Sequence, residues 1–261
     1  MLFLRLSYGA LAVFLLCCSL AARCQQSPET RWISQPSEQT APLSADEVAE
    51  KLERSDEQRA AALEQFSSQR VYRMHYHGFA GDYEAQMVVD VTYRAPNVKQ
   101  FRVVSQTGST FVINHIFKRL MESEQEFIND QNRQETALNT ENYKFTLAGY
   151  DPTLDGGEYV LNLLPRKKNK FLYRGKIWVD GKDFAVVRIE AQPSQSPSLW
   201  IKNTEIEHKY MKVDGFWLPA SDHTESEMRL GGEANLSIEY KDYRITKAGS
   251  HGIERARAGS R

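Results

Sequence analysis

Histidines are the first candidates for chemistry in this chain. His75 and His77 alternate along a predicted strand, so both imidazole rings fall on one strand face, where they could share a metal ion. His208 and His223 lie on two later strands that should pair. Neither pair is accompanied by a cysteine or by an evident third ligand. We therefore predict no metal site.

Motifs of catalysis do not occur in the sequence. It contains no Gly-x-Ser-x-Gly, no His-Glu-x-x-His, no Walker phosphate loop and no dinucleotide fingerprint. Aspartates and glutamates are plentiful but scattered, and an acid/base pair requires a defined geometry. We predict no catalytic residue and no cofactor. A hydrolase of unrecognised type stays as a third alternative.

Apolar residues suggest a site that binds rather than reacts. Alternation along the predicted strands places one set of apolar side chains on a concave sheet face, and its methionines would suit an adaptable apolar pocket. The competing interpretation is a filled core beneath covering helices. The predicted ligand-binding residues are Met74, Tyr76, Met87, Val89, Phe101, Val103, Ile177, Val187, Ile189, Ile206, Leu236 and Ile238.

Two helices are predicted to cover this face. Ser44-Ala-Asp-Glu47 has the pattern of a capping box, which predicts a helix to about Phe66. Its apolar stripe would be Val48, Leu52, Ala60, Leu63 and Phe66. After Gly108, apolar residues recur at helical spacing and predict a second, amphipathic helix. It is the predicted gating helix, with Ile113, Ile116, Phe117, Leu120 and Met121 on its apolar face.

Strand periodicity accounts for most of the remaining domain. The predicted strands are Arg70 to Phe79, Tyr83 to Arg94, Val98 to Gln106, Tyr143 to Gly149, Tyr159 to Leu164, Phe171 to Val179, Phe184 to Ala191, Leu199 to Val213, Phe216 to Met228 and Glu233 to Ile245. Asp180-Gly181 is predicted to form a tight primed turn with positive φ. About ten antiparallel strands are more than a flat open sheet usually holds without curling. We predict an α+β fold, a strongly curled antiparallel β half-barrel with two covering α-helices.

The two ends of the chain differ from this domain. Residues 1–22 combine Arg5, an apolar run from Leu11 to Leu20 and small residues, which is the layout of a signal peptide. The run is shorter than the roughly 20 residues of a membrane span, although an uncleaved anchor is the alternative. We predict a disordered linker at 23–43, the half-barrel at 44–247 and a disordered tail at 248–261. The expected location is the periplasm, or a membrane-tethered position if the signal stays uncut.

Cysteine and charge content narrow the class. Cys17 and Cys18 lie in the signal segment, so only Cys24 would remain and no intramolecular disulfide is expected; Arg23 makes lipidation of Cys24 a poor match. The 33 basic and 34 acidic residues nearly balance, which argues against a nucleic-acid partner. Arg166-Lys-Lys-Asn-Lys170 reads as a solvated basic loop, with peripheral contact to an anionic membrane as the alternative.

Six segments carry a family resemblance: Asn142–Phe145, Tyr159–Arg166, Tyr173–Asp180, Phe184–Glu190, Ser198–Ile201 and Gly215–Ser221. They resemble the bacterial outer-membrane lipoprotein-sorting protein family, which is similar to the carriers LolA and LolB and to the sensor RseB. The resemblance covers roughly Ser44 to Ile245. It implies a half-barrel closed by helices around an apolar cavity that accepts acyl chains, and no functional residue of these relatives can be carried over.

Two functions are predicted. In the first, a non-enzymatic periplasmic protein holds an acyl chain, or the lipid moiety of a lipoprotein, between sheet and helices, at about 0.8 kcal/mol per buried methylene. In the second, a solid-packed half-barrel serves as an interaction or sensor module that docks an envelope protein. A continuous apolar void beneath the helices would support the first function, and a sheet face fully covered by side chains would overturn it.

Overall fold

A computed structural model describes residues 42–247 apart from residues 80, 127–133, 170, 197, 198 and 200. The predictions for the signal segment, for Cys24, for nearly all of the linker and for the tail therefore lie outside the described residues. Lys170 at the end of the basic loop lies outside them too.

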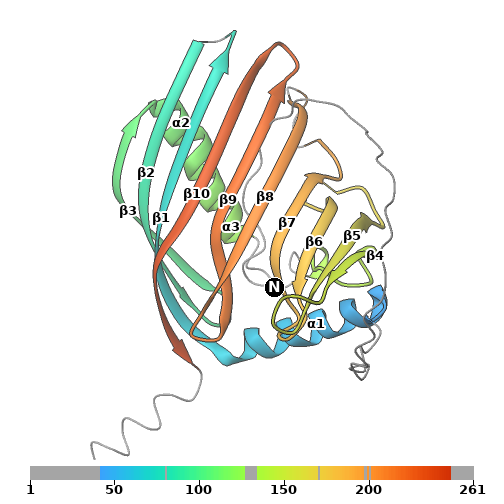
Figure 1. Cartoon of the computed structure of the whole chain (residues 1–261). Helices are drawn as coiled ribbons and strands as arrows, with labels where there is room; N and C mark the ends of the chain where they lie inside the picture. The colour runs from blue at the N-terminus through green and yellow to red at the C-terminus, as the bar shows by residue number, and fades with distance from the viewer. Residues whose placement is uncertain are drawn as a thin grey trace, which may run out of the picture.

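The described residues form one antiparallel sheet in the order β3-β2-β1-β10-β9-β8-β7-β6-β5-β4, in which the first strand pairs with the last (Figure 1). The sheet is open, because β3 and β4 each have one neighbour. This confirms the predicted α+β half-barrel. The strands are β1 (Leu63–Gly78), β2 (Gly81–Arg94), β3 (Val98–Gly108), β4 (Tyr143–Asp151), β5 (Glu158–Pro165), β6 (Tyr173–Asp180), β7 (Ala185–Pro193), β8 (Ile201–Val213), β9 (Phe216–Met228) and β10 (Gly232–Lys247).

Helix α1 (Ala45–Ala62) begins at the predicted capping box. The Ser44 amide donates to Glu47 Oε2 at 2.8 Å, and the Glu47 amide donates to Ser44 Oγ at 3.3 Å. The predicted end at Phe66 was wrong. The helix stops at Ala62 because Leu63 and Phe66 belong to β1, where Phe66 pairs with Tyr93 of β2 and stacks on its ring.

The predicted gating helix consists of three consecutive segments, α2 (Thr110–Val112), the π-helical turn η1 (Ile113–Phe117) and α3 (Lys118–Glu126). We call the whole of Thr110–Glu126 the cover helix. It follows β3 through Gly108. The φ of this residue is 90°, a value that favours glycine, and a Cβ at this position would clash with the backbone of Glu84. The chain thus turns sharply from the sheet edge into the helix.

The predicted primed turn at Asp180-Gly181 was wrong. Positive φ occurs instead at Phe184, and the turn spans residues 181–184. The Asp180 carboxylate accepts hydrogen bonds from the amides of Lys182 and Asp183, which holds a longer loop. Gly181 is required because a Cβ there would lie 2.2 Å from the Gly156 carbonyl oxygen. At Asp214-Gly215, both φ angles are positive.

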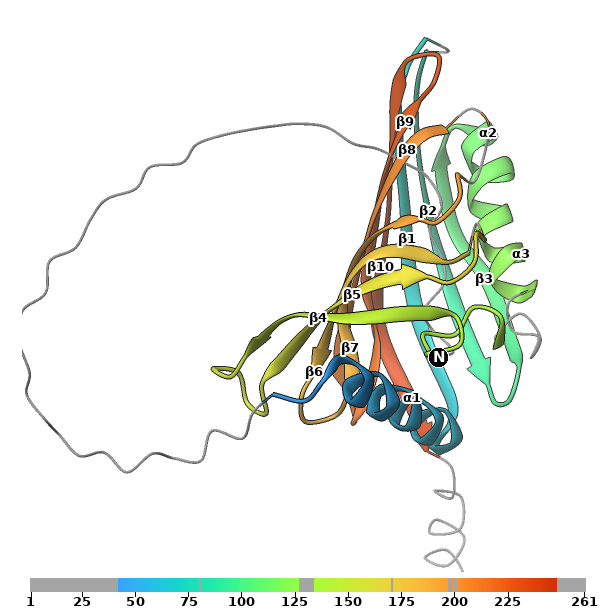
Figure 2. The same cartoon turned by 90° about the vertical axis from the view of Figure 1, so that its right-hand side faces the viewer.

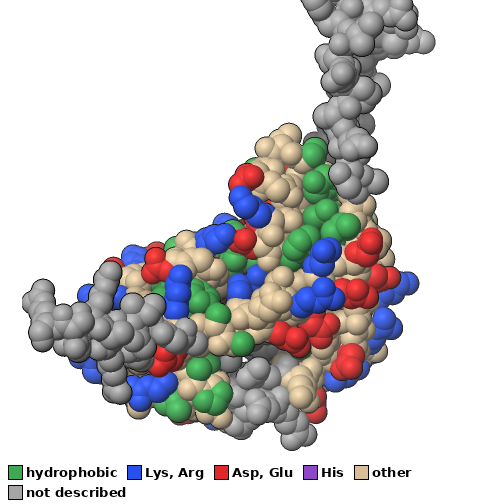
Figure 3. All heavy atoms as spheres, turned by 90° about the horizontal axis from the view of Figure 1, so that it is seen from below, with side chains coloured by type: hydrophobic (Ala, Val, Ile, Leu, Met, Phe, Trp, Pro, Cys, Tyr) green, Lys and Arg blue, Asp and Glu red, His purple; other side chains and the backbone are tan. Residues whose placement is uncertain are grey.

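The two helices cover different halves of the sheet (Figure 2). Helix α1 packs on the half that contains β4 to β8, and the cover helix packs on β1, β2 and β10. Over the face seen from below, Lys and Arg side chains alternate with Asp and Glu side chains, in keeping with the near balance of charge in the sequence (Figure 3).

Candidate functional site

The predicted ligand-binding residues fall into two buried apolar clusters rather than one continuous surface. Ile177, Ile189 and Ile206 pack with Val48, Ala49 and Leu52 of α1. The second cluster contains predicted residues from the sheet together with the predicted gating residues. Its members include Met87, Val89, Leu236, Ile238, Ile113, Phe117, Leu120 and Met121, with Met74, Phe101 and Ile116 packed at its margin.

Three predicted residues lie elsewhere. Tyr76 packs with Ala234 in a small separate cluster near the end of the sheet. Val103 is 42% exposed, because β3 is an edge strand and the cover helix leaves that part of it open. A bulge between β6 and β7 skips Val187, so Val186 takes the position in the core that strict alternation assigns to Val187. The expected placement of Val187 on the concave face was therefore wrong. Val103 pairs with the buried Val89, so it does lie on the concave face, but at its exposed edge.

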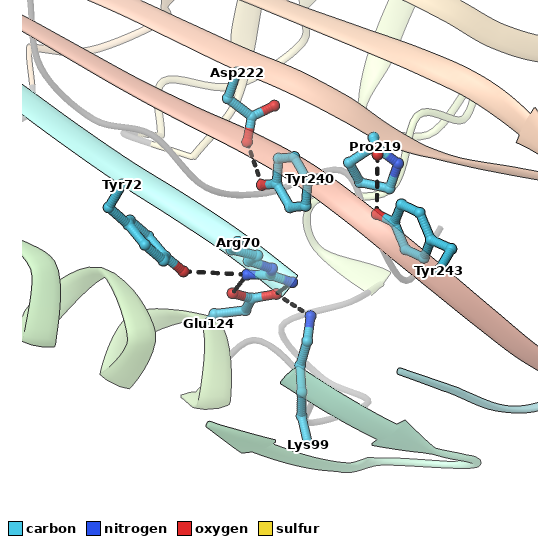
Figure 4. Close-up of polar contacts among 8 residues, drawn as sticks. All are labelled: Arg70, Tyr72, Lys99, Glu124, Pro219, Asp222, Tyr240 and Tyr243. Atoms are coloured by element: carbon cyan, nitrogen blue, oxygen red, sulfur yellow. Dashed lines mark hydrogen bonds and ion pairs between the residues drawn. The ribbon is translucent and has the colours of Figure 1, made fainter. Parts of the chain in front are cut away.

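A charged cluster fastens the cover helix to the sheet (Figure 4). Glu124 of α3 accepts two hydrogen bonds from the Arg70 guanidinium of β1, at 2.6 Å and 3.0 Å. Lys99 of β3 donates to the same carboxylate. All three residues are buried. Two cations thus meet a single carboxylate under the last turns of the helix.

The protonation equilibria of this cluster reflect its burial. Desolvation, together with repulsion from Arg70, lowers the pKa of Lys99 from 10.5 to about 8 despite the attraction of Glu124. Burial by itself would raise the pKa of Glu124, but the charges of Arg70 and Lys99 outweigh burial and hold the pKa below its ordinary value. The carboxylate is therefore strongly held in its ionised form, and Lys99 is the less favoured of the two cations.

Polar contacts continue from this cluster to the middle of the sheet. The ring of Tyr240 lies 4.8 Å from the Arg70 guanidinium, and its hydroxyl donates to Asp222. Asp222 also lies 2.6 Å from Nδ1 of His208 on β8. This buried chain of contacts crosses the space between the two apolar clusters. His208 and Asp222 pair across β8 and β9, so the predicted strand pairing was confirmed.

Several buried polar atoms have no hydrogen-bond partner within the described part of the chain. They include Nε of Arg70 and Oγ of Ser68, which is two residues earlier on the same face of β1. Others are Oγ1 of Thr204, Oγ of Ser226 and Nε2 of His208 on β8 and β9. A buried donor or acceptor without a partner costs free energy, typically about 1–3 kcal/mol. The concave face therefore has unused hydrogen-bonding capacity beside its charged cluster.

A groove of about 1090 Å³ lies next to the charged cluster. Its lining includes Ser68 of β1, Lys99 and Phe101 of β3, Gln125 of α3 and Tyr243 of β10. The groove thus reaches one of the two buried cations from the end of the cover helix. It is lined by mixed polar and aromatic side chains, and so it differs from the apolar void expected beneath the helices.

The sequence prediction missed every member of the charged cluster, although a signal was present. Arg70 falls on the same strand face as Tyr72 and Met74, and Lys99 falls on the same face as Phe101. Glu124 follows Leu120 and Met121 at helical spacing. Charged residues at positions where the pattern calls for apolar ones indicate burial with a partner.

Two absences hold for the described residues. They contain no group of histidine, cysteine, aspartate and glutamate side chains that could hold a metal ion. None of their helices is both long enough and apolar enough to cross a membrane.

No protein-family model matches this sequence. No curated protein matches it either. Among solved structures, a DUF1329 family protein from Desulfovibrio piger is similar over 82% of this chain and 98% of its own, with 15% identity and a TM-score of 0.38. An outer membrane lipoprotein-sorting protein domain from Vibrio parahaemolyticus is similar over 83% and 98%, with 11% identity and a TM-score of 0.38.

A LolA superfamily protein from Nitrosomonas europaea is similar over 78% of this chain and 94% of its own, with 15% identity and a TM-score of 0.32. These matches include the group that the sequence motifs resemble. Identities and TM-scores at this level carry no argument about ligand or partner.

Proposed function

We propose that this chain is a non-enzymatic binding protein that holds an acyl chain, either free or as the lipid moiety of a lipoprotein, on the sheet face beneath the cover helix. One observation carries the proposal. The apolar side chains of β1, β2 and β10 are buried by one face of a single helix, so displacing that helix would expose a continuous apolar surface.

Displacement of the helix is required because the side chains beneath it are closely packed. Met87, Val89 and Ile238 have no exposed surface, and Phe117 fills the space against the Tyr72 ring, 5.7 Å away between centroids. An acyl chain would therefore replace the helix side chains rather than fill a void. Each methylene that it buries would contribute about 0.8 kcal/mol, which offsets part of the free energy needed to separate the helix from the sheet.

Binding of this kind is coupled to an opening equilibrium. If the open form is a minor population, the apparent dissociation constant is the intrinsic constant divided by the open fraction. Loosening the helix should therefore tighten apparent binding. Export to the periplasm, predicted from residues 1–22, belongs to the same proposal, since acyl chains and lipoproteins would be met in the envelope.

Uptake of a fluorescent fatty acid tests this function. The full chain, purified from the envelope fraction, is examined by native mass spectrometry for bound lipid and then titrated with cis-parinaric acid. We expect co-purified lipid or saturable uptake. Recovery of lipid-free protein that takes up no cis-parinaric acid would count against the proposal.

A matched pair of variants tests where the ligand enters. Phe117→Ala removes the buried phenylalanine ring of the cover helix, and Phe145→Ala removes an equal ring from the cluster under α1. We expect several-fold tighter uptake for Phe117→Ala and no change for Phe145→Ala. Equal responses of the two variants would show that the cover helix is not the entrance.

Close packing favours a second function, an envelope interaction or sensor module. The end of the sheet near the β1–β2 and β9–β10 turns carries apolar side chains that could dock a protein: Phe79 is 92% exposed and Leu230 is 71% exposed. These turns are neighbours because Gly78 pairs with Gly232. Failure of lipid uptake together with loss of a partner on Phe79→Ser would support this function instead.

A further inference from the structure

The cover helix presents an apolar stripe that ends in a carboxylate. Ile113, Phe117 and Leu120 pack on the sheet, and Glu124 completes the same face at the far end. The stripe from residue 113 to residue 124 is about 16 Å long at the rise of an α-helix. A fatty acid has the same order of groups, an apolar chain that ends in a carboxylate.

The sheet supplies complementary groups at the matching place. Arg70 holds the Glu124 carboxylate with two hydrogen bonds, and Lys99 donates to it as well. A fork of this kind is the geometry by which arginine recognises a carboxylate. When the helix moves away, Arg70 and Lys99 would both lose the carboxylate that they hold, and removing the opposite charge from buried cations is strongly unfavourable.

Asp222, the next buried carboxylate, does not compensate the positive charge of Arg70 and Lys99. Asp222 is already engaged by the hydroxyl of Tyr240 and by His208. The ring of Tyr240 packs against the Arg70 guanidinium between the two groups. Among the residues that the structure describes, the cluster therefore has two cations for one carboxylate, and that carboxylate belongs to the cover helix.

The adjoining groove provides room for an incoming carboxylate. Lys99 and Ser68 both line this space of about 1090 Å³. The Ser68 hydroxyl and Nε of Arg70 are buried donors with no partner inside the described ranges of the chain. A carboxylate with more freedom than the Glu124 side chain could accept from either donor.

Resting on the function proposed above, we propose that the ligand is a fatty acid whose carboxylate replaces Glu124 between Arg70 and Lys99 while its chain replaces the apolar face of the cover helix. Exchange of one carboxylate for another conserves the charge of the buried cluster. The site thus distinguishes a fatty acid from an esterified acyl chain, which lacks the negative charge. No bond is made or broken.

The test compares cis-parinaric acid with its methyl ester at neutral pH, using the full chain. We expect the acid to bind at least about tenfold more tightly than the ester, the ratio that one charge-assisted hydrogen bond supplies. Lys99→Met should weaken binding of the acid by about tenfold and leave the ester unchanged. Lys182→Met, which removes an exposed lysine paired with Asp155, is the matched control and should change neither.

Glu124→Gln tests the replacement from the other side. Loss of the competing carboxylate should tighten binding of the acid by about tenfold and affect the ester less. Should this variant fail to fold, Lys99→Met decides independently, because it leaves Arg70 and Glu124 paired one to one.

The possible results separate the two proposals. If wild-type protein binds neither the acid nor the ester, the acyl-binding function itself is wrong. If it binds both equally and Lys99→Met changes nothing, acyl binding stands and the carboxylate site is overturned. If acetate alone displaces the acid completely at millimolar concentration, the cations recognise a free anion, and the fatty-acid proposal is overturned as well.

Discussion

The two helices both cover the concave face of the half-barrel, but different kinds of contact hold them in place. Helix α1 is held by apolar packing and by hydrogen bonds to backbone carbonyls: Val48 and Leu52 are fully buried, and the Arg59 guanidinium donates to the carbonyl oxygens of Asp183 and Phe184. It also runs directly into β1. The cover helix is held by apolar packing and by the carboxylate of Glu124 between two cations.

This difference separates a permanent part of the fold from a replaceable one. The guanidinium that α1 donates to backbone carbonyls has no counterpart in a fatty acid. The carboxylate that the cover helix places between two cations does have one. A cover that can be exchanged for a ligand is therefore expected over β1, β2 and β10, and a fixed cover over β4 to β8.

The largest effect is expected from Leu52→Ala. Leu52 lies fully buried under α1, and truncation of a buried leucine typically costs about 2–5 kcal/mol in the free energy of unfolding. Chemical denaturation measures this loss, with the half-exposed Leu154→Ala as a control that should change stability by less than about 0.5 kcal/mol. If α1 is a fixed cover, uptake of cis-parinaric acid by the folded variant stays at the wild-type level. If Leu52→Ala instead takes up more cis-parinaric acid than wild type, α1 is also an exchangeable cover and the two helices do not differ in this respect.

A somewhat smaller effect is expected from pH through Lys99. Its pKa is lowered in the folded state, from 10.5 to about 8, so the unfolded chain binds that proton more tightly between these values. The free energy of unfolding should therefore rise with pH through this window, by on the order of 3 kcal/mol at most. In Lys99→Met this rise should be missing.

Tyrosines limit the upper end of that measurement. Burial raises the pKa of Tyr72 to about 12, so the unfolded chain loses its tyrosine protons first and stability falls again above about pH 10. The comparison of wild type with Lys99→Met is best made by urea denaturation between about pH 8 and pH 9.5. If the free energy of unfolding depends on pH in the same way in both proteins, the pKa of Lys99 is not lowered in the folded state.

The smallest effect is expected from Arg59→Met. It removes two hydrogen bonds from α1 to the turn between β6 and β7 and keeps most of the apolar stem. A cost of about 1–3 kcal/mol in the free energy of unfolding is expected for bonds donated by a charged group. Arg73→Met, which breaks a partly exposed pair with Glu239, should cost less than about 1 kcal/mol. A similar small cost for both would mean that α1 is not fastened through Arg59.

Sequence patterns predicted the fold well because it rests on local periodicity. Alternating residues defined β2 and β9, and the capping box at Ser44 defined the start of α1. Two local details escaped this reasoning. The Asp180 loop depends on contact with Gly156, and the inward position of Val186 depends on a bulge against β6.

The charged cluster could not be assembled from local patterns. Arg70 and Glu124 are 54 residues apart, and Lys99 is 25 residues from Glu124, so their meeting depends on how the sheet curls beneath the helix. Each residue read alone suggests an exposed charge. Their places in apolar registers were the available signal, and the partner of each could be found only in three dimensions.

The pairing of β1 with β10 has a consequence for how the molecule comes into being. Strands β4 to β10 pair with sequence neighbours and can form as successive hairpins, whereas the unit of β1, β2 and β3 joins them only through the last strand. Closing so long a loop is slow in folding. A nascent chain that stops before Gly232 would therefore carry β1 with an open edge, and the surface beneath the cover helix would be the last part of the protein to mature.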